Sequence, residues 1–102
     1  MDSFTFSILY DRAVPKGVRD KILRWTDKLK DFLPVDSKVA SWDDCTCNYR
    51  INLADGTVTG KLEILDEEIF FTTQLESATV TQDAFQTAVK AIIKELFPGS
   101  SA

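Results

Sequence analysis

The stretch that decides the fold runs from Cys45 to Leu65 and reads CTCNYRINLADGTVTGKLEIL. Apolar and polar residues alternate on both sides of Ala54-Asp55-Gly56, a tripeptide that favours a tight turn. Successive residues of a strand point to opposite faces of the sheet. The stretch therefore predicts a β-hairpin with one apolar and one polar face. The apolar face is expected to carry Cys45, Cys47, Tyr49, Ile51 and Leu53, followed by Val58, Gly60, Leu62 and Ile64.

Three other segments also read as strands. Residues 36–42 form a short strand candidate that ends at Trp42, and Asp43-Asp44 then favours a turn. A second turn at residues 66–68 leads into a strand over 69–76. The first segment, residues 3–10, alternates as the hairpin does. The side chains expected to face the core from residues 3–10 are Phe4, Phe6, Ile8 and Tyr10.

Two segments instead repeat their apolar residues every three or four positions, which predicts amphipathic helices over 14–33 and about 82–97. Pro15 suits a first helical turn, and Pro34 marks the end of the first helix. Thr79 or Thr81 is expected to cap the second helix. The buried stripes are expected to be Val18, Ile22, Trp25, Leu29 and Phe32 in the first helix, and Phe85, Val89, Ile92, Ile93 and Leu96 in the second.

The resulting order is strand, helix, four strands, helix. Strands with one apolar face are typical of antiparallel sheets that are solvated on the other side. The sequence therefore predicts a single α+β domain over residues 1–102, folded as a two-layer sandwich with both helices on one face of an antiparallel sheet.

Composition excludes several classes of function. The chain has 102 residues with a net charge of −4, which argues against nucleic acid as a partner. It lacks the run of about 20 apolar residues that a membrane span requires, and its start does not read as a signal peptide. It has no histidine, so the commonest neutral-pH base and metal ligand are missing. We therefore expect a cytoplasmic protein without a cofactor that is not an enzyme.

The pair Cys45 and Cys47 raises the question of redox or metal chemistry. Residues two apart on a strand have Cα atoms roughly 6.6–6.8 Å apart, near the upper limit for a disulfide. Two thiolates without further cysteine or histidine ligands do not complete a zinc site. Packing as small apolar side chains is the favoured interpretation, and redox activity stays open.

Two sets of apolar residues suggest ligands. Leu65, Phe70 and Phe97 fall off the apolar faces and are candidates for an exposed surface that binds a protein partner or a second copy of the chain. The second set consists of rings that either fill the core or line a cavity between helices and sheet. Its members are Phe4, Phe6, Trp25, Trp42, Tyr49 and Phe85.

Three motifs also carry a family resemblance: Ser41-Trp42-Asp43, the run DGTVTGKLEI over residues 55–64, and Asp66-Glu67-Glu68-Ile69. With a last helix that ends in Leu96-Phe97, the chain resembles the polyhydroxyalkanoic acid system proteins, a small bacterial family. It departs from them in its mixed Asp/Lys first helix and in lacking an N-terminal histidine. The resemblance supplies no catalytic residues, and it implies a cytoplasmic, non-enzymatic protein associated with polyester granules.

The leading hypothesis is therefore a non-enzymatic binding domain that acts on a hydrophobic surface or protein partner. The alternative is a carrier that holds a small apolar ligand between its helices and its sheet.

Overall fold

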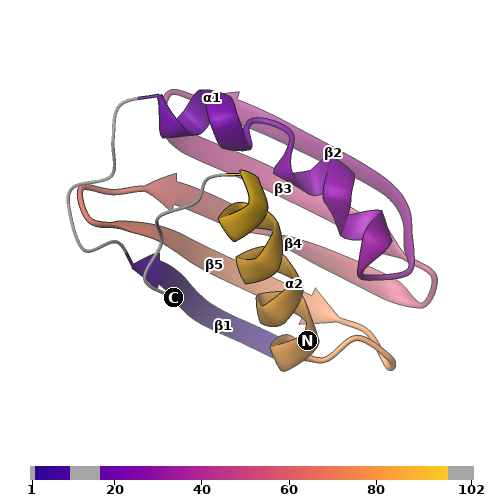
Figure 1. Cartoon of the computed structure of the whole chain (residues 1–102). Helices are drawn as coiled ribbons and strands as arrows, with labels where there is room; N and C mark the ends of the chain where they lie inside the picture. The colour runs from indigo at the N-terminus through magenta and orange to yellow at the C-terminus, as the bar shows by residue number, and fades with distance from the viewer. Residues whose placement is uncertain (1, 10–16, 97–102) are drawn as a thin grey trace.

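The structure, a computed structural model, describes residues 2–9 and 17–96 (Figure 1). One strand comes before the first helical segment, four strands follow it in succession, and a helix ends the described chain, which is the order that the sequence predicts. The elements are β1 (Asp2–Leu9), α1 (Val18–Ile22), the 3-10 helix η1 (Trp25–Asp31), β2 (Val35–Asp43), β3 (Thr46–Leu53), β4 (Gly56–Ile64), β5 (Glu68–Glu76) and α2 (Gln82–Leu96).

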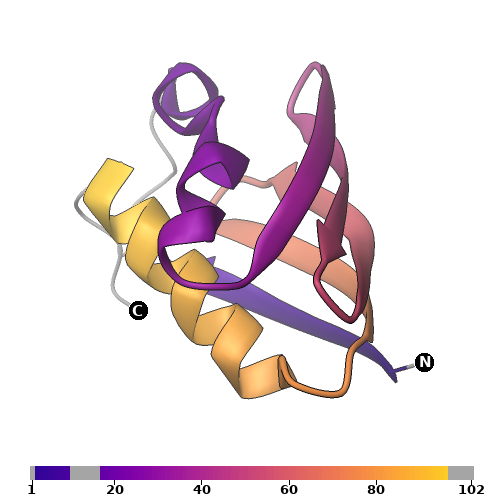
Figure 2. The same cartoon turned by 90° about the vertical axis from the view of Figure 1, so that its right-hand side faces the viewer.

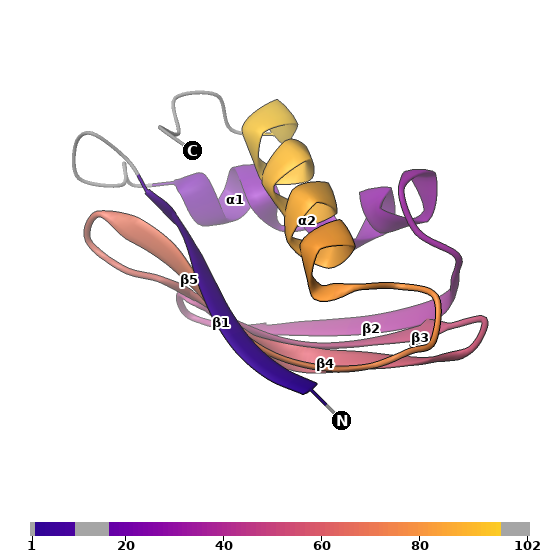
Figure 3. The same cartoon turned by 90° about the horizontal axis from the view of Figure 1, so that it is seen from below.

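The five strands form one antiparallel sheet in the order β1-β5-β4-β3-β2. The strands β2 to β5 follow one another as hairpins, whereas β1 pairs with β5 at the far side, for example Thr5 with Thr72. Figure 3 shows the helices lying together on one face of the curved sheet. In Figure 2, α2 crosses that face beside α1 and η1. The predicted α+β two-layer sandwich is confirmed.

The apolar face of the central hairpin packs against the helices. Cys47, Tyr49, Ile51 and Leu53 of β3 are buried, whereas Thr46, Asn48, Arg50 and Asn52 are not. From β4, Val58 and Leu62 are buried, while Gly60 and Ile64 are half-buried. The helix α2 contributes Phe85, Ala88, Val89, Ile92 and Ile93 to the same core. The alternation of the sequence therefore identifies the inner face of β3 and β4 correctly.

The predicted single helix over 14–33 is wrong in its described part. The helix α1 ends at Ile22, and Arg24, with φ −112° and ψ 32°, separates it from η1. Because a 3-10 helix has about three residues per turn, its buried face drifts away from the α-helical stripe. Phe32 is consequently 48% exposed, and Leu33 takes the buried place.

The expected inward position of Cys45 is also wrong. The turn lies one residue later than predicted, at Asp44-Cys45, so that β3 begins only at Thr46 and Cys45 is exposed. Asp44 adopts a positive φ of 56°, which an aspartate tolerates in a tight turn. At the start of α2, Thr81 is the capping residue, because its hydroxyl oxygen accepts a hydrogen bond from the Ala84 N–H (3.1 Å). The expected inward position of Tyr10 lies outside the described residues.

Within the described ranges, the helices are all too short or too polar to cross a bilayer.

Candidate functional site

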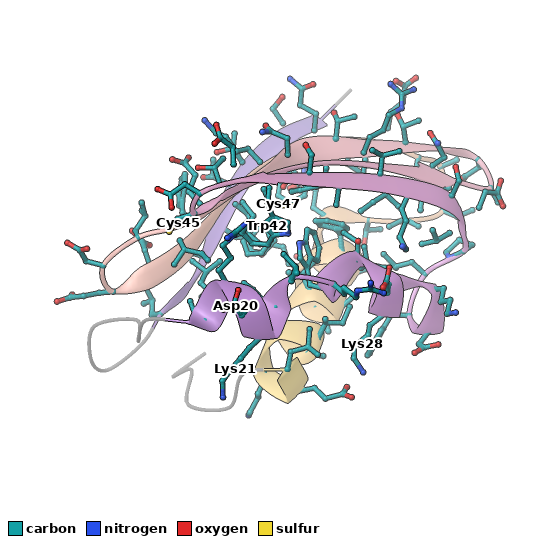
Figure 4. The ribbon with its side chains drawn as sticks, turned by 90° about the horizontal axis from the view of Figure 1, so that it is seen from above. Asp20, Lys21, Lys28, Trp42, Cys45 and Cys47 are labelled. Atoms are coloured by element: carbon teal, nitrogen blue, oxygen red, sulfur yellow. The ribbon has the colours of Figure 1, made fainter. Side chains whose placement is uncertain are left out.

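The outer face of the sheet, opposite the helices, carries the first candidate surface. Side chains that end in nitrogen or oxygen cover much of this face (Figure 4). Phe70 of β5 interrupts them: it lies between Ser7 of β1 and Glu63 of β4 and is half-buried. The predicted outward orientation of Phe70 therefore agrees with the register of the sheet.

Leu65 and Leu9 flank the same end of the outer face. Leu9 lies opposite Glu68 in the register of β1 and β5, and the Leu65 N–H donates to the Glu68 carbonyl (2.8 Å). Leu9 is 53% exposed and Leu65 is 42% exposed. We call Leu9, Leu65 and Phe70 the apolar patch. Leu9 was not among the residues predicted for this surface, although its position between Ile8 and Tyr10, both expected to face inward, was a sufficient signal in the sequence.

The apolar patch borders a shallow hollow of about 550 Å³ with an acidic rim. The hollow is lined by the two leucines and by Asp66, Glu67 and Glu68 of the β4–β5 turn. Because three adjacent carboxylates repel other anions, the rim favours a neutral or cationic partner over an anionic one. Phe97, the third residue predicted for this surface, lies outside the described residues.

The six rings proposed to line a cavity are brought together between helices and sheet. Phe6, Trp25, Tyr49 and Phe85 are buried, and Phe4 and Trp42 are partly buried at the margin. Trp25 meets Tyr49 edge to face at a centroid distance of 5.1 Å, and Phe6 and Phe85 lie 6.2 Å apart. These distances are typical of rings in direct contact. The rings thus pack on one another, and an apolar-ligand carrier stays a prediction.

Trp42 joins the edge strand β2 to the helix layer. Its indole N–H donates to the Leu23 carbonyl at the end of α1 (3.1 Å). The guanidinium carbon of Arg19 lies 5.7 Å from the centroid of the Trp42 ring, within reach of a cation–π interaction. These contacts hold β2 against α1, so Trp42 has a structural role in this arrangement.

The two cysteines are placed differently and do not form a site together. Cys45 lies on the surface in the β2–β3 turn, and Cys47 points into the core (Figure 4). Burial raises the pKa of the Cys47 thiol above its usual value, which disfavours the reactive thiolate. Among residues 2–9 and 17–96, no group of three or more His, Cys, Asp or Glu side chains is arranged so that it could hold a metal ion.

The edge of the sheet at β2 is the second candidate surface. Residues 36–41 are exposed, and Val39, on the outer face, is 66% exposed. On the helix side, Lys38 forms a salt bridge with Asp27 of η1. A hollow of about 370 Å³ follows the edge and is lined by Leu23, Arg24, Thr26, Asp27, Lys38, Val39 and Ala40.

Comparison of the chain with protein-family models, with curated proteins and with solved structures gives no match. The function is therefore proposed from the fold, from these two surfaces and from the resemblance that the sequence carries.

Proposed function

We propose that this chain is a non-catalytic binding domain that attaches to a hydrophobic polymer surface through the apolar patch. The observation that carries the proposal is the position of Leu9, Leu65 and Phe70 together at one end of a sheet face that is otherwise largely polar. Apolar side chains gathered at one place on a soluble domain commonly mark a contact surface. The resemblance to polyhydroxyalkanoic acid system proteins makes a polyester granule the favoured surface.

The chemistry of the core supports a non-catalytic role. Of the residues that the structure describes, the buried ones that can ionise are Cys47 and Tyr49, and burial raises the pKa of each side chain above its usual value, away from neutrality. A catalytic acid or base usually lies in a cleft that shifts its pKa toward neutrality. The groups with lowered carboxylate pKa values, Asp27 and Asp55, are instead surface residues held by neighbouring side chains.

The acidic rim distinguishes among hydrophobic surfaces. Asp66, Glu67 and Glu68 would approach any surface on which Leu9 and Leu65 rest, because all five residues line one hollow. A bilayer rich in anionic lipid repels these carboxylates, whereas a neutral polyester does not. We therefore expect binding to polyester particles and weak binding to anionic vesicles.

Co-sedimentation with polyhydroxyalkanoate particles tests the proposal. The double variant Leu9→Ser, Leu65→Ser removes the exposed leucines and should weaken particle binding about tenfold or more, because burying the exposed part of two leucines is worth about 1.5–3 kcal/mol. Both residues are exposed, so thermal unfolding should confirm that the variant folds.

Phe32→Ser is the matched control, since Phe32 is similarly exposed but lies at the end of η1 in the helix layer. Its particle binding should equal that of the wild type. Retention of the wild type in the supernatant would overturn the proposal. Equal weakening by the control variant would show that the apolar patch is not the contact surface.

A further inference from the structure

The strand β2 ends the sheet, and its residues 36–41 are exposed. It hydrogen-bonds to β3 on one side, and no strand among residues 2–9 and 17–96 lies on its other side. Such an edge presents unpaired backbone groups on which another strand can add. Among the exposed large apolar residues, Val39 in the middle of β2 has the highest exposed fraction.

The hairpin between β2 and β3 fixes which backbone groups face outward. Asp43 and Thr46 close a two-residue turn, so they form a hydrogen-bonded pair of the antiparallel ladder. Because such pairs alternate, Val39 and Ser41 direct their N–H and C=O groups at β3. The groups of Lys38, Ala40 and Trp42 point away from β3 along the edge.

The sequence of β2 can pair with itself in an antiparallel register centred on Val39. When the two-fold axis passes through Val39, Lys38 lies opposite the partner's Ala40, and both residues offer outward backbone groups for hydrogen bonds. Val39 then meets the partner's Val39 as a non-hydrogen-bonded pair, the closest approach that an antiparallel ladder allows. A register centred on Lys38 instead places two ammonium groups opposite each other, which is unfavourable.

The lysine that would ordinarily protect this edge is already engaged. A lysine on an edge strand disfavours pairing because pairing would strip water from its charge. The Lys38 ammonium, however, is turned toward η1 by its salt bridge to Asp27. Beside it, the hollow of about 370 Å³ between Leu23, Thr26 and the edge leaves room for side chains of an added strand.

From these observations we infer that two copies of the chain pair through β2 in the register centred on Val39. The dimer has one continuous sheet with five strands from each copy. Its two-fold axis is perpendicular to the sheet, so both outer faces look the same way. If the proposed function holds, this arrangement presents two apolar patches to one surface and strengthens attachment by avidity.

The mass of the native protein in solution, measured by light scattering after size exclusion, tests the dimer. The wild type should show twice the chain mass of 11.5 kDa, and Val39→Lys should show the single mass because it places two charges at the axis. Leu65→Lys, also an exposed apolar residue, should remain dimeric. A monomeric wild type up to its solubility limit, or a dimeric Val39→Lys, overturns the inference.

Cysteine cross-linking tests the register centred on Val39 without a substitution that disrupts the dimer. In a Cys45→Ser background, Val39→Cys should form a disulfide between copies under mild oxidation, because facing residues of a non-hydrogen-bonded pair lie within disulfide range. Ser41→Cys, on the same face of β2, should not, since the two cysteines would lie about 13 Å apart. Cross-linking of Ser41→Cys alone, or of neither variant, overturns this register.

Particle binding is measured separately and keeps the two proposals distinct. Val39→Lys retains the apolar patch but loses the partner, so its apparent affinity should fall about tenfold or more through lost avidity. A dimer that fails to bind particles contradicts the proposed function and leaves the pairing through β2 intact. Tight particle binding by a strictly monomeric wild type overturns the pairing through β2 and leaves the proposed function intact.

Discussion

The phenol oxygen of Tyr49 lies 2.7 Å from the hydroxyl oxygen of Thr73, and the hydrogen bond between them spans Gly60. Tyr49 is on β3, Gly60 on β4 and Thr73 on β5, and the three are directly opposite one another in the sheet. Because glycine has no side chain, the tyrosine ring can lie across the middle strand. A buried hydroxyl pair is thereby satisfied within the core.

Gly60→Ala should be among the most destabilising single substitutions in the sheet. A Cβ at this position would lie 2.7 Å from the Tyr49 phenol oxygen and 2.3 Å from the Thr72 carbonyl oxygen. Relieving that overlap must move the ring or the strand, at a cost of about 3 kcal/mol in the free energy of unfolding. Urea denaturation measures the change.

Gly17→Ala provides the comparison for this substitution. No atom lies within 4 Å of a Cβ built at Gly17, although its φ of +88° disfavours alanine. That strain should cost about 1 kcal/mol. A loss at Gly60 no larger than the loss at Gly17 would mean that Tyr49 does not lie across β4.

Alkaline pH should destabilise the protein through Tyr49. Burial raises the pKa of Tyr49 above its usual value of 10.0, and the hydrogen bond with Thr73 only partly offsets that effect. Above about pH 10 the unfolded chain releases this proton while the folded chain retains it, so the free energy of unfolding falls with rising pH. The decrease approaches about 1.4 kcal/mol per pH unit.

Absorbance titration of a Tyr10→Phe variant, in which Tyr49 is the remaining tyrosine, reports this ionisation directly. Phenolate should appear only together with unfolding. In Tyr49→Phe, the free energy of unfolding should fall less steeply above about pH 10, because the contribution of the Tyr49 proton is gone. Reversible ionisation of Tyr49 near pH 10 in the folded protein would contradict the buried position of its hydroxyl group.

The ionised carboxylate of Asp55 should stabilise the folded protein, and this contribution should be lost when acid protonates it. Its carboxylate accepts hydrogen bonds from the Ser77 hydroxyl (2.7 Å), the Thr79 hydroxyl (3.0 Å) and the Ala78 N–H (3.1 Å). These bonds, with Ser77 first, lower the pKa of Asp55 below its usual value of 3.8. The contribution is therefore complete above that value and is lost as pH falls through the lower, folded-state pKa.

Thermal unfolding of Asp55→Asn should show a lower midpoint at neutral pH and a shallower loss toward acid than the wild type. The carboxylate joins the β3–β4 turn to the loop before α2, so the variant loosens that connection. Asp66→Asn, in the β4–β5 turn, is the control and should behave as the wild type. Identical acid profiles for Asp55→Asn and the wild type would refute this assignment.

The two thiols should differ sharply in reactivity. Cys45 is exposed in the β2–β3 turn, whereas Cys47 is fully buried and burial raises the pKa of its thiol. A thiol reagent should therefore modify one cysteine per folded chain and both after denaturation. Cys45→Ser should abolish the native reaction, and Cys47→Ser should retain it. Rapid native labelling of Cys45→Ser would place Cys47 within reach of solvent.

Strand alternation was sufficient to predict the inner face of the sheet, because a one-residue shift would expose every buried side chain at once. The break between α1 and η1 was not predictable in this way. Val18, Ile22, Trp25 and Leu29 fit an α-helical stripe and are all buried, so the change to a 3-10 helix alters only the end of the pattern, at Phe32 and Leu33.

The candidate surfaces depend on strand order, which a local pattern does not contain. Leu65 and Phe70 were predicted as outward residues, but their proximity to Leu9 follows from the pairing of β1 with β5. Similarly, the exposure of Val39 follows from the position of β2 at the edge. The sequence of residues 36–42 reads equally well as a central strand or as an edge strand.

The pairing of β1 with β5 also constrains how the protein is made. During synthesis β1 leaves the ribosome before β5, its neighbour in the described sheet, has been translated. The hairpins from β2 to β5 can form in succession, but Phe6 and Ile8 have no strand to pair with until Phe71 and Ile69 emerge. The nascent chain therefore carries an unpaired apolar strand until β5 has been made, and an unpaired strand of this kind is prone to aggregation.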